Sequence, residues 1–298
     1  MTTTTGATAQ DIRFHYDVGN DFYALWLDDT MAYSAALWEN PDADETDTAV
    51  LTAAQRANQR LHLDRAAVAP GGRLLDVGCG WGGMLSLAAH DAHVGEATGL
   101  TLSPAQLAHV NSLGLPRVEV RLEDWRDHAP ERPYDAIVSL EAFEAFAGPD
   151  LTTAQRIAAY TEFFARCHSW LIPSGTLSLQ VIAFDGGVDG SGPVGAFFTR
   201  DVFPATILPR LSEVAAACDP YFSLTASHSD TPAYIRTFRA WSARLLRNRD
   251  QAQAIVGAAT YQRYRVYLKA CEVLAHRGDL TVYRIVMRRR PQPLHLQA

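Results

Sequence analysis

The sequence predicts an α/β protein built on a Rossmann-like, mostly parallel sheet of seven strands with helices on both faces. Short apolar runs alternate with helical segments between residues 73 and 182, the pattern of parallel strands joined by crossover helices. The first apolar run passes directly into a glycine-rich turn at residues 78–83. A last alternating run at residues 281–287 closes the pattern.

The chain before the sheet, residues 1–70, is expected to form a leader and a helical arm. Residues 1–10 are small and polar and predict a disordered leader. Aromatic and apolar residues recur at helical spacing over 11–28, which predicts a helix there. The Ala-, Gln- and Arg-rich run 48–69 predicts a long helix that ends at Pro70-Gly71-Gly72.

The following part, residues 71–298, is expected to carry the sheet. Its strands are predicted at 73–77, 93–100, 118–122, 134–140, 175–182, 222–227 and 281–287. Its helices are predicted at 84–90, 103–113, 152–171, late in 197–217, at 234–247 and at 261–276. Ser103 has the side chain of an N-cap. The alternation breaks after Ile182, which indicates a helical cover over about residues 183–250.

Composition excludes several classes of protein. The 298 residues include 26 Lys and Arg against 33 Asp and Glu, a net charge of −7, with 48% hydrophobic residues. That apolar content is enough for a folded core, and the acidic balance argues against a nucleic-acid partner. We therefore expect a globular protein that acts on a small molecule or an acyl chain, with a homodimer as one possible assembly.

The four cysteines, Cys79, Cys167, Cys218 and Cys271, are far apart and form no C-x-x-C pair. This spacing argues against a zinc site, so no metal is expected, and against a disulfide framework. The first ten residues lack the basic-then-apolar pattern of a signal peptide. No apolar run reaches 18 residues, so no transmembrane helix is expected. These features predict a cytoplasmic protein.

The glycine turn indicates a nucleotide-like cofactor. Gly78-x-Gly80-x-x-Gly83 fits the dinucleotide fingerprint, but the second strand ends in Gly99-Leu100-Thr101, without the acidic residue that would hold a ribose. The run Leu75 to Gly82, with Asp76 before the glycines, fits S-adenosylmethionine better. A dinucleotide oxidoreductase, and a tight turn without a ligand, remain alternatives.

Several further motifs follow in order along the chain. They are His15 to Tyr23, Leu25 to Asp28, Thr30 to Ser34, Leu75 to Gly82, Gly99 to Ser103 with Gln106, Ile137 to Ser139, Phe143-Glu144, Phe203-Pro204, Leu208-Pro209 and Tyr234 to Trp241. From about Phe14 to Met287 the chain resembles the cyclopropane fatty acyl phospholipid synthases and mycolic acid cyclopropane synthases. The resemblance implies the class I fold of S-adenosyl-L-methionine (SAM)-dependent methyltransferases.

The resemblance also implies which residues bind the cofactor. Tyr33 and Ser34 would fold over its methionine end, next to Asp76 and the turn residues Gly78, Cys79 and Gly80. The ribose and adenine would meet Thr101, Leu102, Gln106, Asp124 and Trp125. Gln106 can both donate to and accept from ribose hydroxyls, which accounts for the missing acidic residue.

In the resembling family, methylation of a cis alkene gives a carbocation, and a bound bicarbonate then removes a proton to close a cyclopropane. By resemblance, Glu144, Tyr234 and Cys271 match family positions at this site, and the aromatic arm with Tyr16 would line the acceptor. Three positions depart from the family, at Ala35, Ala145 and Gln180. These departures put bicarbonate binding and ring closure in doubt more than methyl transfer.

The sequence therefore favours a C-methyltransferase acting on an electron-rich carbon of a small specialised metabolite, such as an indole or a prenyl alkene, without cyclopropane closure. Glu144 lies among apolar neighbours and is expected to have a raised pKa and to serve as base, with Tyr234 and Gln180 nearby. One alternative is an enzyme that cyclopropanates or methylates unsaturated fatty acyl chains. An alternative of another class is a SAM-binding regulatory module without catalysis.

Overall fold

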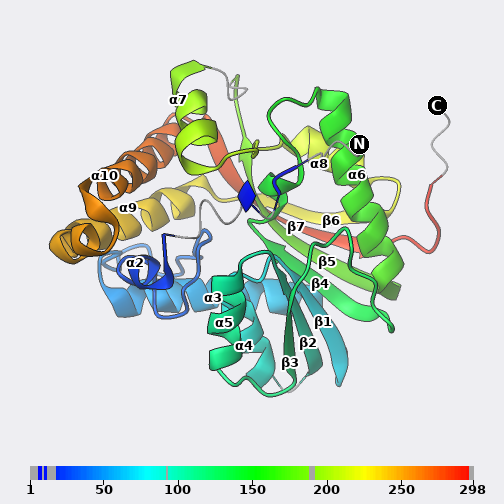
Figure 1. Cartoon of the computed structure of the whole chain (residues 1–298). Coiled ribbons are helices and arrows are strands. Elements are labelled where there is room, and N and C mark those ends of the chain that lie inside the picture. Colours follow the sequence, from blue (N-terminus) through cyan, green and yellow to red (C-terminus); the bar gives the residue numbers. More distant parts are fainter. Residues whose placement is uncertain (1–5, 9, 12–17, 92, 188–191, 295–298) are drawn as a thin grey trace.

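A seven-stranded sheet forms the centre of the computed structural model (Figure 1), which describes all residues except 1–5, 9, 12–17, 92, 188–191 and 295–298. The strand order is β3-β2-β1-β4-β5-β7-β6. Strands β1 to β5 pair in parallel, and β7 is antiparallel to both β5 and β6. The bounds are β1 Gly72–Val77, β2 Val94–Thr101, β3 Val118–Leu122, β4 Tyr134–Leu140, β5 Leu171–Phe184, β6 Phe222–Ser229 and β7 Leu280–Arg289. The predicted fold class is confirmed.

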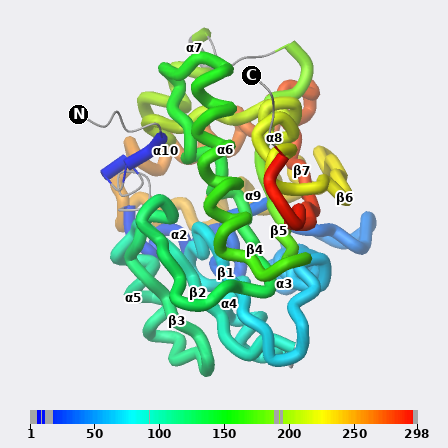
Figure 2. Tube along the Cα trace, turned by 90° about the vertical axis from the view of Figure 1, so that its right-hand side faces the viewer, coloured from blue at the N-terminus to red at the C-terminus, as the bar shows by residue number. Residues whose placement is uncertain are grey.

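Helices cover both faces of the sheet, because its central strands are apolar on both sides. On one face, Leu74 packs with side chains of α3 (Thr48–Ala66), α4 (Gly83–His90) and α5 (Pro104–Ser112). On the other face, Leu75 packs with α6 (Thr153–Trp170) and α8 (Leu211–Cys218). Figure 2 shows α6 running along the face of the central strands.

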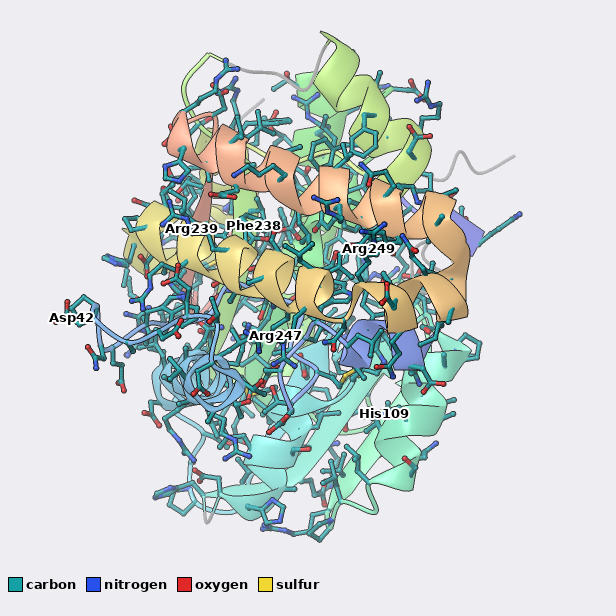
Figure 3. All side chains as sticks on the ribbon, turned by 90° about the vertical axis from the view of Figure 1, so that its left-hand side faces the viewer. Asp42, His109, Phe238, Arg239, Arg247 and Arg249 are labelled. Atoms are coloured by element: carbon teal, nitrogen blue, oxygen red, sulfur yellow. The ribbon has the colours of Figure 1, made fainter. Side chains whose placement is uncertain are left out.

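A helical cover lies beyond the carboxyl ends of the parallel strands. It consists of α2 (Asn20–Ala24), α7 (Gly192–Phe197), the π-helix η2 (Phe198–Val202), α9 (Thr231–Arg247) and α10 (Arg249–His276). Figure 3 shows α9 and α10 side by side across this part of the molecule. The cover has its own apolar core, in which the rings of Trp26 and Trp241 meet at 5.8 Å.

The arm differs from its sequence-based prediction. Of the helix predicted over 11–28, the described residues show Asp11 and α2, Asn20–Ala24, as helical, and residues 12–17 lie outside the description. Gly19 precedes α2 with a φ of 97°, which is not helical, and α2 ends at Ala24. Further along, the Asp28 carboxylate accepts hydrogen bonds from the backbone N–H groups of Thr30 and Ala32 and so stabilises the turn that follows.

Two other predictions need correction. Within the predicted disordered leader, Ala7 is buried, and its N–H donates to the carbonyl of Ala145 at 2.8 Å. The last helix is longer than predicted, since α10 begins at Arg249 and bends at Gly257, whose φ is 77°. The cover therefore extends past residue 250. The N-cap predicted at Ser103 is confirmed, because its hydroxyl accepts from the N–H of Gln106.

Across the described residues, no helix is long and apolar enough to cross a membrane.

One buried ion pair joins the cover to the sheet. The Arg284 guanidinium is fully buried on β7 and donates to Asp230 at 2.7 Å and to Asn58 at 2.8 Å. It also donates to the carbonyl of Ala36 at 3.0 Å. The pair therefore fixes the start of α9 and the chain segment near residue 35 against the same strand.

We expect Asp230→Ala to destabilise the protein by about 3–5 kcal/mol, because it leaves a buried guanidinium without its counter-charge. Urea unfolding measures the change. The matched control is Asp219→Ala, which removes a surface partner of Arg290 and should cost about 1 kcal/mol or less. Equal losses in the two variants would contradict this account of Arg284.

Candidate functional site

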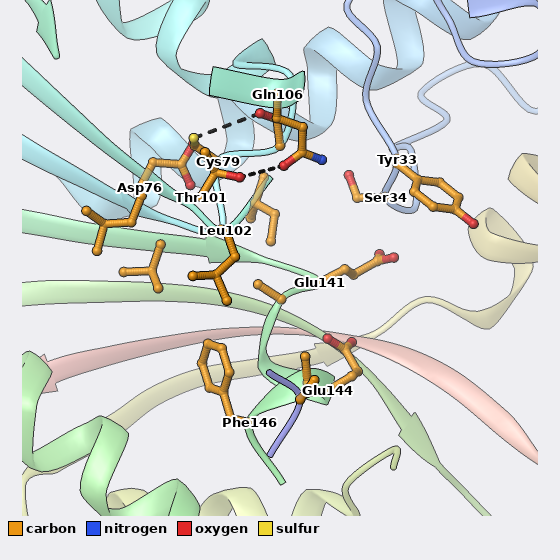
Figure 4. A pocket seen from close by; sticks show the side chains of 18 of the residues that line it. Tyr33, Ser34, Asp76, Cys79, Thr101, Leu102, Gln106, Glu141, Glu144 and Phe146 are labelled. Atoms are coloured by element: carbon orange, nitrogen blue, oxygen red, sulfur yellow. Dashed lines mark hydrogen bonds between the residues drawn. The ribbon is translucent and has the colours of Figure 1, made fainter. Parts of the chain in front are cut away.

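A cavity opens where the carboxyl ends of β1, β2 and β4 meet the helical cover (Figure 4). Ligands of doubly wound folds bind at this edge of the sheet. Every residue that the sequence assigned to the cofactor lines this cavity: Tyr33, Ser34, Asp76, Gly78, Cys79, Gly80, Thr101, Leu102, Gln106, Asp124 and Trp125. Glu144 and Tyr234 line the same cavity.

The glycine turn after β1 forms part of the cavity wall. Gly78 and Gly80 have φ values of 81° and 53°, in the region that favours glycine. A Cβ at Gly78 would lie 2.3 Å from the Cβ of Ala142, so the turn packs closely against the exit of β4. The N–H groups of Gly78 and Cys79 both donate to the carbonyl of Leu100, which ties the turn to β2.

Asp76 is an acid without a counter-group. It is 2% exposed, and its carboxyl group makes no hydrogen bond to any described residue. Burial raises its pKa to about 7. A buried carboxyl group without a partner, facing a cavity, is suited to a ligand that carries a positive charge or hydrogen-bond donors.

Gln106 is oriented by its neighbours on β2 and α5. The Thr101 hydroxyl donates to its Oε1 at 2.7 Å, so the amide nitrogen is left to face the cavity, as Figure 4 shows. The Ser103 cap holds the first turn of α5 in place. The site therefore offers an N–H donor to a hydroxyl-bearing ligand at the end of β2.

Asp124 and Trp125 follow β3 and form another part of the wall. The Asp124 carboxylate accepts from the N–H of Arg126 at 2.9 Å. The Trp125 ring packs on Phe146 at 5.1 Å and on Phe163 at 5.4 Å, so it serves the core as well as the cavity. Opposite them, the Tyr33 hydroxyl donates to that of Tyr267 at 2.9 Å.

Ser34 is held through its backbone. Its carbonyl accepts from the Gln55 amide on α3 at 2.7 Å. Tyr33 and Ser34 thus lie on a segment that is fixed from both α3 and the cover.

Glu144 lies in the short 3₁₀ helix η1 (Phe143–Phe146) after β4 and is 6% exposed. Its Oε1 accepts from the N–H of Ile182, whereas its Oε2 is buried with no hydrogen-bond partner among the described residues. Burial, and then the nearby charge of Glu141, raise the pKa of Glu144 to about 8. The expected raised pKa is confirmed in direction, and at neutral pH this side chain carries a proton.

Glu141, which the sequence analysis did not single out, is the second acid of the site. Its Oε1 accepts from the N–H of Ala35 and from Gln180 Nε2, both at 2.7 Å. Its Oε2 accepts from the Tyr234 hydroxyl at 3.0 Å. Burial raises the pKa of Glu141 above its ordinary value, and the three hydrogen bonds offset only part of that rise. One sequence feature could have identified Glu141: it is an acidic residue at the carboxyl end of a buried strand, three positions before Glu144.

His62 orients the side-chain amide of Gln180 through a hydrogen bond to its oxygen. The ring of His62 lies between the Ser178 hydroxyl, 2.8 Å from Nδ1, and Gln180 Oε1, 3.0 Å from Nε2. Since Oε1 can only accept, Nε2 carries the proton and the amide nitrogen of Gln180 must face Glu141. Burial lowers the pKa of His62 to about 3, so the ring stays neutral.

The remaining predicted residues lie elsewhere. Cys271 is buried on α10 in the core of the cover, and it does not line the cavity. Tyr16 lies outside the described residues. In the part of the chain that the structure describes, no group of three or more His, Cys, Asp or Glu side chains could hold a metal ion.

The sheet and cavity define a class I SAM-dependent methyltransferase fold. A solved structure of mycolic acid cyclopropane synthase CmaA1 with S-adenosylhomocysteine and CTAB superposes with a TM-score of 0.82, at 30% identity over 95% of this chain and 99% of that one. The family model for mycolic acid cyclopropane synthetase matches residues 3–285. The chain belongs to this family.

Curated relatives agree with the family model. Cyclopropane mycolic acid synthase 2 of Mycobacterium bovis is 34% identical over 88% of this chain and 89% of its own. Hydroxymycolate synthase MmaA4 of the same organism is 33% identical over 91% of this chain and 89% of its own. Relatives of similar identity therefore carry names for different products.

We expect Gly78→Ala to weaken binding of S-adenosylhomocysteine at least tenfold, because the new methyl group must displace Ala142 and strain the turn. Isothermal titration calorimetry measures the affinity. Gly114→Ala is the matched control, since Gly114 has a φ of 59° with nothing within 4 Å of its Cβ position. Unchanged affinity in Gly78→Ala would show that the glycine turn does not contact the cofactor.

The proton on Glu144 predicts a pH dependence of stability. Its folded-state pKa of about 8 lies above the ordinary value of 4.5, so its contribution is complete below pH 4.5 and is lost as the pH rises toward 8. We expect the wild type to lose about 3 kcal/mol relative to Glu144→Gln between pH 5 and pH 8. Urea unfolding of both proteins tests this, and parallel pH profiles would contradict it.

Proposed function

We propose that this protein transfers a methyl group to a carbon of a double bond in an unsaturated acyl chain. The observation that carries the proposal is one cavity lined by the cofactor residues, by apolar side chains and by two carboxyl groups, the buried Glu144 and the half-buried Glu141. The protein is a SAM-dependent methyltransferase-type enzyme, and S-adenosyl-L-methionine is its cofactor. When bound, this cofactor supplies an electrophilic methyl group on a sulfonium.

The protein holds the cofactor through groups that are otherwise unpaired. Asp76 offers a buried carboxyl group to the amino group of the methionine portion, which would stabilise the charged acid. The Gln106 amide nitrogen faces the cavity and can donate to a ribose hydroxyl. Gly78 and Gly80 let the backbone approach the ligand closely.

Aromatic rings surround the place where positive charge would develop. The Tyr33 ring lines the cavity and packs on Tyr23 at 5.6 Å, Trp26 at 5.3 Å and Trp241 at 5.4 Å. Ring faces attract cations. This cluster would hold Tyr33 in place beside a sulfonium or a carbocation while excluding water.

Part of the cavity wall is apolar and is proposed to face the acceptor. It includes Ile182 at the end of β5 together with Phe203, Pro204 and Leu208 from the cover. These side chains offer no charge or polar side-chain group to a compact metabolite. The names of the relatives also favour an acyl chain over the indole or prenyl acceptor that the sequence favoured.

The proposal is tested by incubating the protein with methyl-labelled SAM and phospholipid vesicles. We expect label in unsaturated acyl chains, each heavier by one CH₂, and none in saturated chains. Indole and a prenyl alcohol serve as competing acceptors. Label in one of these and none in the unsaturated chains would overturn the proposal.

Leu208→Trp should reduce turnover of the acyl acceptor at least tenfold by filling the apolar part of the cavity, while S-adenosylhomocysteine binding stays within twofold. Calorimetry and the label assay separate these two effects. Leu224→Trp, on the exposed side of β6, is the matched control and should change neither quantity. Normal turnover in Leu208→Trp would place the acceptor elsewhere.

A further inference from the structure

The Glu141 carboxylate fills a pocket of hydrogen-bond donors that come from separate parts of the chain. The N–H of Ala35, Nε2 of Gln180 and the hydroxyl of Tyr234 all point at it, within 2.7 to 3.0 Å. Such a set of donors is suited to any planar oxyanion. Because Glu141 already accepts from all three, they are not open to a free anion such as bicarbonate.

The backbone at Glu141 is strained to bring the carboxylate there. Its φ of 54° lies in the left-handed region, which is unfavourable for a glutamate. Residues persist in such conformations where the surrounding structure holds them, and these positions cluster at functional sites. The left-handed conformation aims the Glu141 side chain at the Ala35 segment, where it meets the three donors.

We propose that the Glu141 carboxylate is the proton acceptor of the reaction, built into the chain, so that this step needs no free anion. This inference rests on the proposed function and names a further catalytic residue for it. Glu141 and Glu144 line the cavity together, close to the Tyr33 cluster and the apolar wall. A proton acceptor must lie in the cavity where the acceptor carbon is methylated, and Glu141 lines the cavity that the residues assigned to the cofactor also line.

The two acids differ in how well the protein supports an anion. Glu141 accepts three hydrogen bonds and is favoured by the charge of Arg284, whereas Glu144 accepts from one backbone N–H and has a buried oxygen without a partner. Hydrogen bonds stabilise the ionised form of a carboxyl group. Of two neighbouring acids, the less supported one keeps the proton. The negative charge therefore lies on Glu141.

The reaction balances with this acceptor. The π electrons of the alkene form the new carbon–carbon bond to the methyl group, and the sulfur keeps the electron pair of the broken bond. The cation left on the acyl chain loses a C–H proton to Glu141. The electron pair of that C–H bond closes a cyclopropane or forms a new double bond. Glu141 then gives up its proton to water as the product leaves.

The deciding experiment compares Glu141→Gly with Glu141→Gln. Glycine relieves the strained φ and vacates the pocket while leaving the three donors, so this variant should fold. Glutamine fills the pocket but cannot take up a proton. Ser174→Gly, at an exposed position near the start of β5 with a φ of 67°, is the matched control for the backbone change.

We expect both Glu141 variants to lose at least a hundredfold in turnover of unsaturated chains, with S-adenosylhomocysteine binding within a few-fold of wild type. Added bicarbonate or formate should restore Glu141→Gly at least tenfold. Neither anion should change the wild type or Glu141→Gln, and Ser174→Gly should behave as wild type. Rescue confined to the glycine variant supports the proposal.

A second readout needs no turnover. In the presence of S-adenosylhomocysteine, ¹³C NMR should show bicarbonate bound to Glu141→Gly and not to the wild type. Bicarbonate bound to the wild type, or wild-type turnover in Glu141→Gln, would overturn the inference. Failure of the wild type to methylate any alkene would instead overturn the proposed function, whatever the anion-binding result.

Discussion

The half-buried carboxylate of Glu141, just after β4, is the group around which the site is arranged. Placing an anion there requires donors, and they come from the Ala35 segment, β5 and α9. Each of those donors is fixed by a further contact, such as His62 behind Gln180 and the Phe238 ring stacked on Tyr234 at 4.1 Å. The Ala35 segment, the sheet and the cover therefore each contribute one hydrogen-bond donor to a single acid.

The same arrangement brings the residues proposed to bind the cofactor and those proposed to face the acceptor into one cavity. The parallel strands bring the carboxyl ends of β1, β2 and β4 to one edge of the sheet, where the glycine turn and Gln106 line the cavity. The late insertion of α9 and α10 then closes that edge with aromatic and apolar side chains. Chemistry that passes through a carbocation needs both parts, because the cation must be kept from water until it loses its proton.

Much of this could be predicted from the sequence. The apolar runs are short, buried and spaced by helical segments, so their period identifies the strands to within a few residues. The cofactor residues lie in contiguous motifs around the glycine turn and the second strand, and those motifs are local. The cap at Ser103 and the raised pKa of Glu144 likewise follow from immediate neighbours.

What could not be predicted depends on contacts between distant segments. Glu141 acquires its surroundings from Ala35 and Tyr234, which are 106 and 93 positions away along the chain. Ala7 is buried and its N–H donates to the carbonyl of Ala145, a contact that no pattern in the neighbouring sequence predicts. Helical spacing over 11–28 did not predict the non-helical Gly19, whose φ is 97°, or the end of the helix at Ala24.

The left-handed backbone at Glu141 has an evolutionary consequence. A glycine can occupy such a position without conformational cost, and glycine and glutamate codons can differ by one base. Gain or loss of this acid is therefore a single mutational step with little effect on folding. Under the role proposed for Glu141, one such step separates an enzyme that carries its own base from one that depends on a dissolved anion.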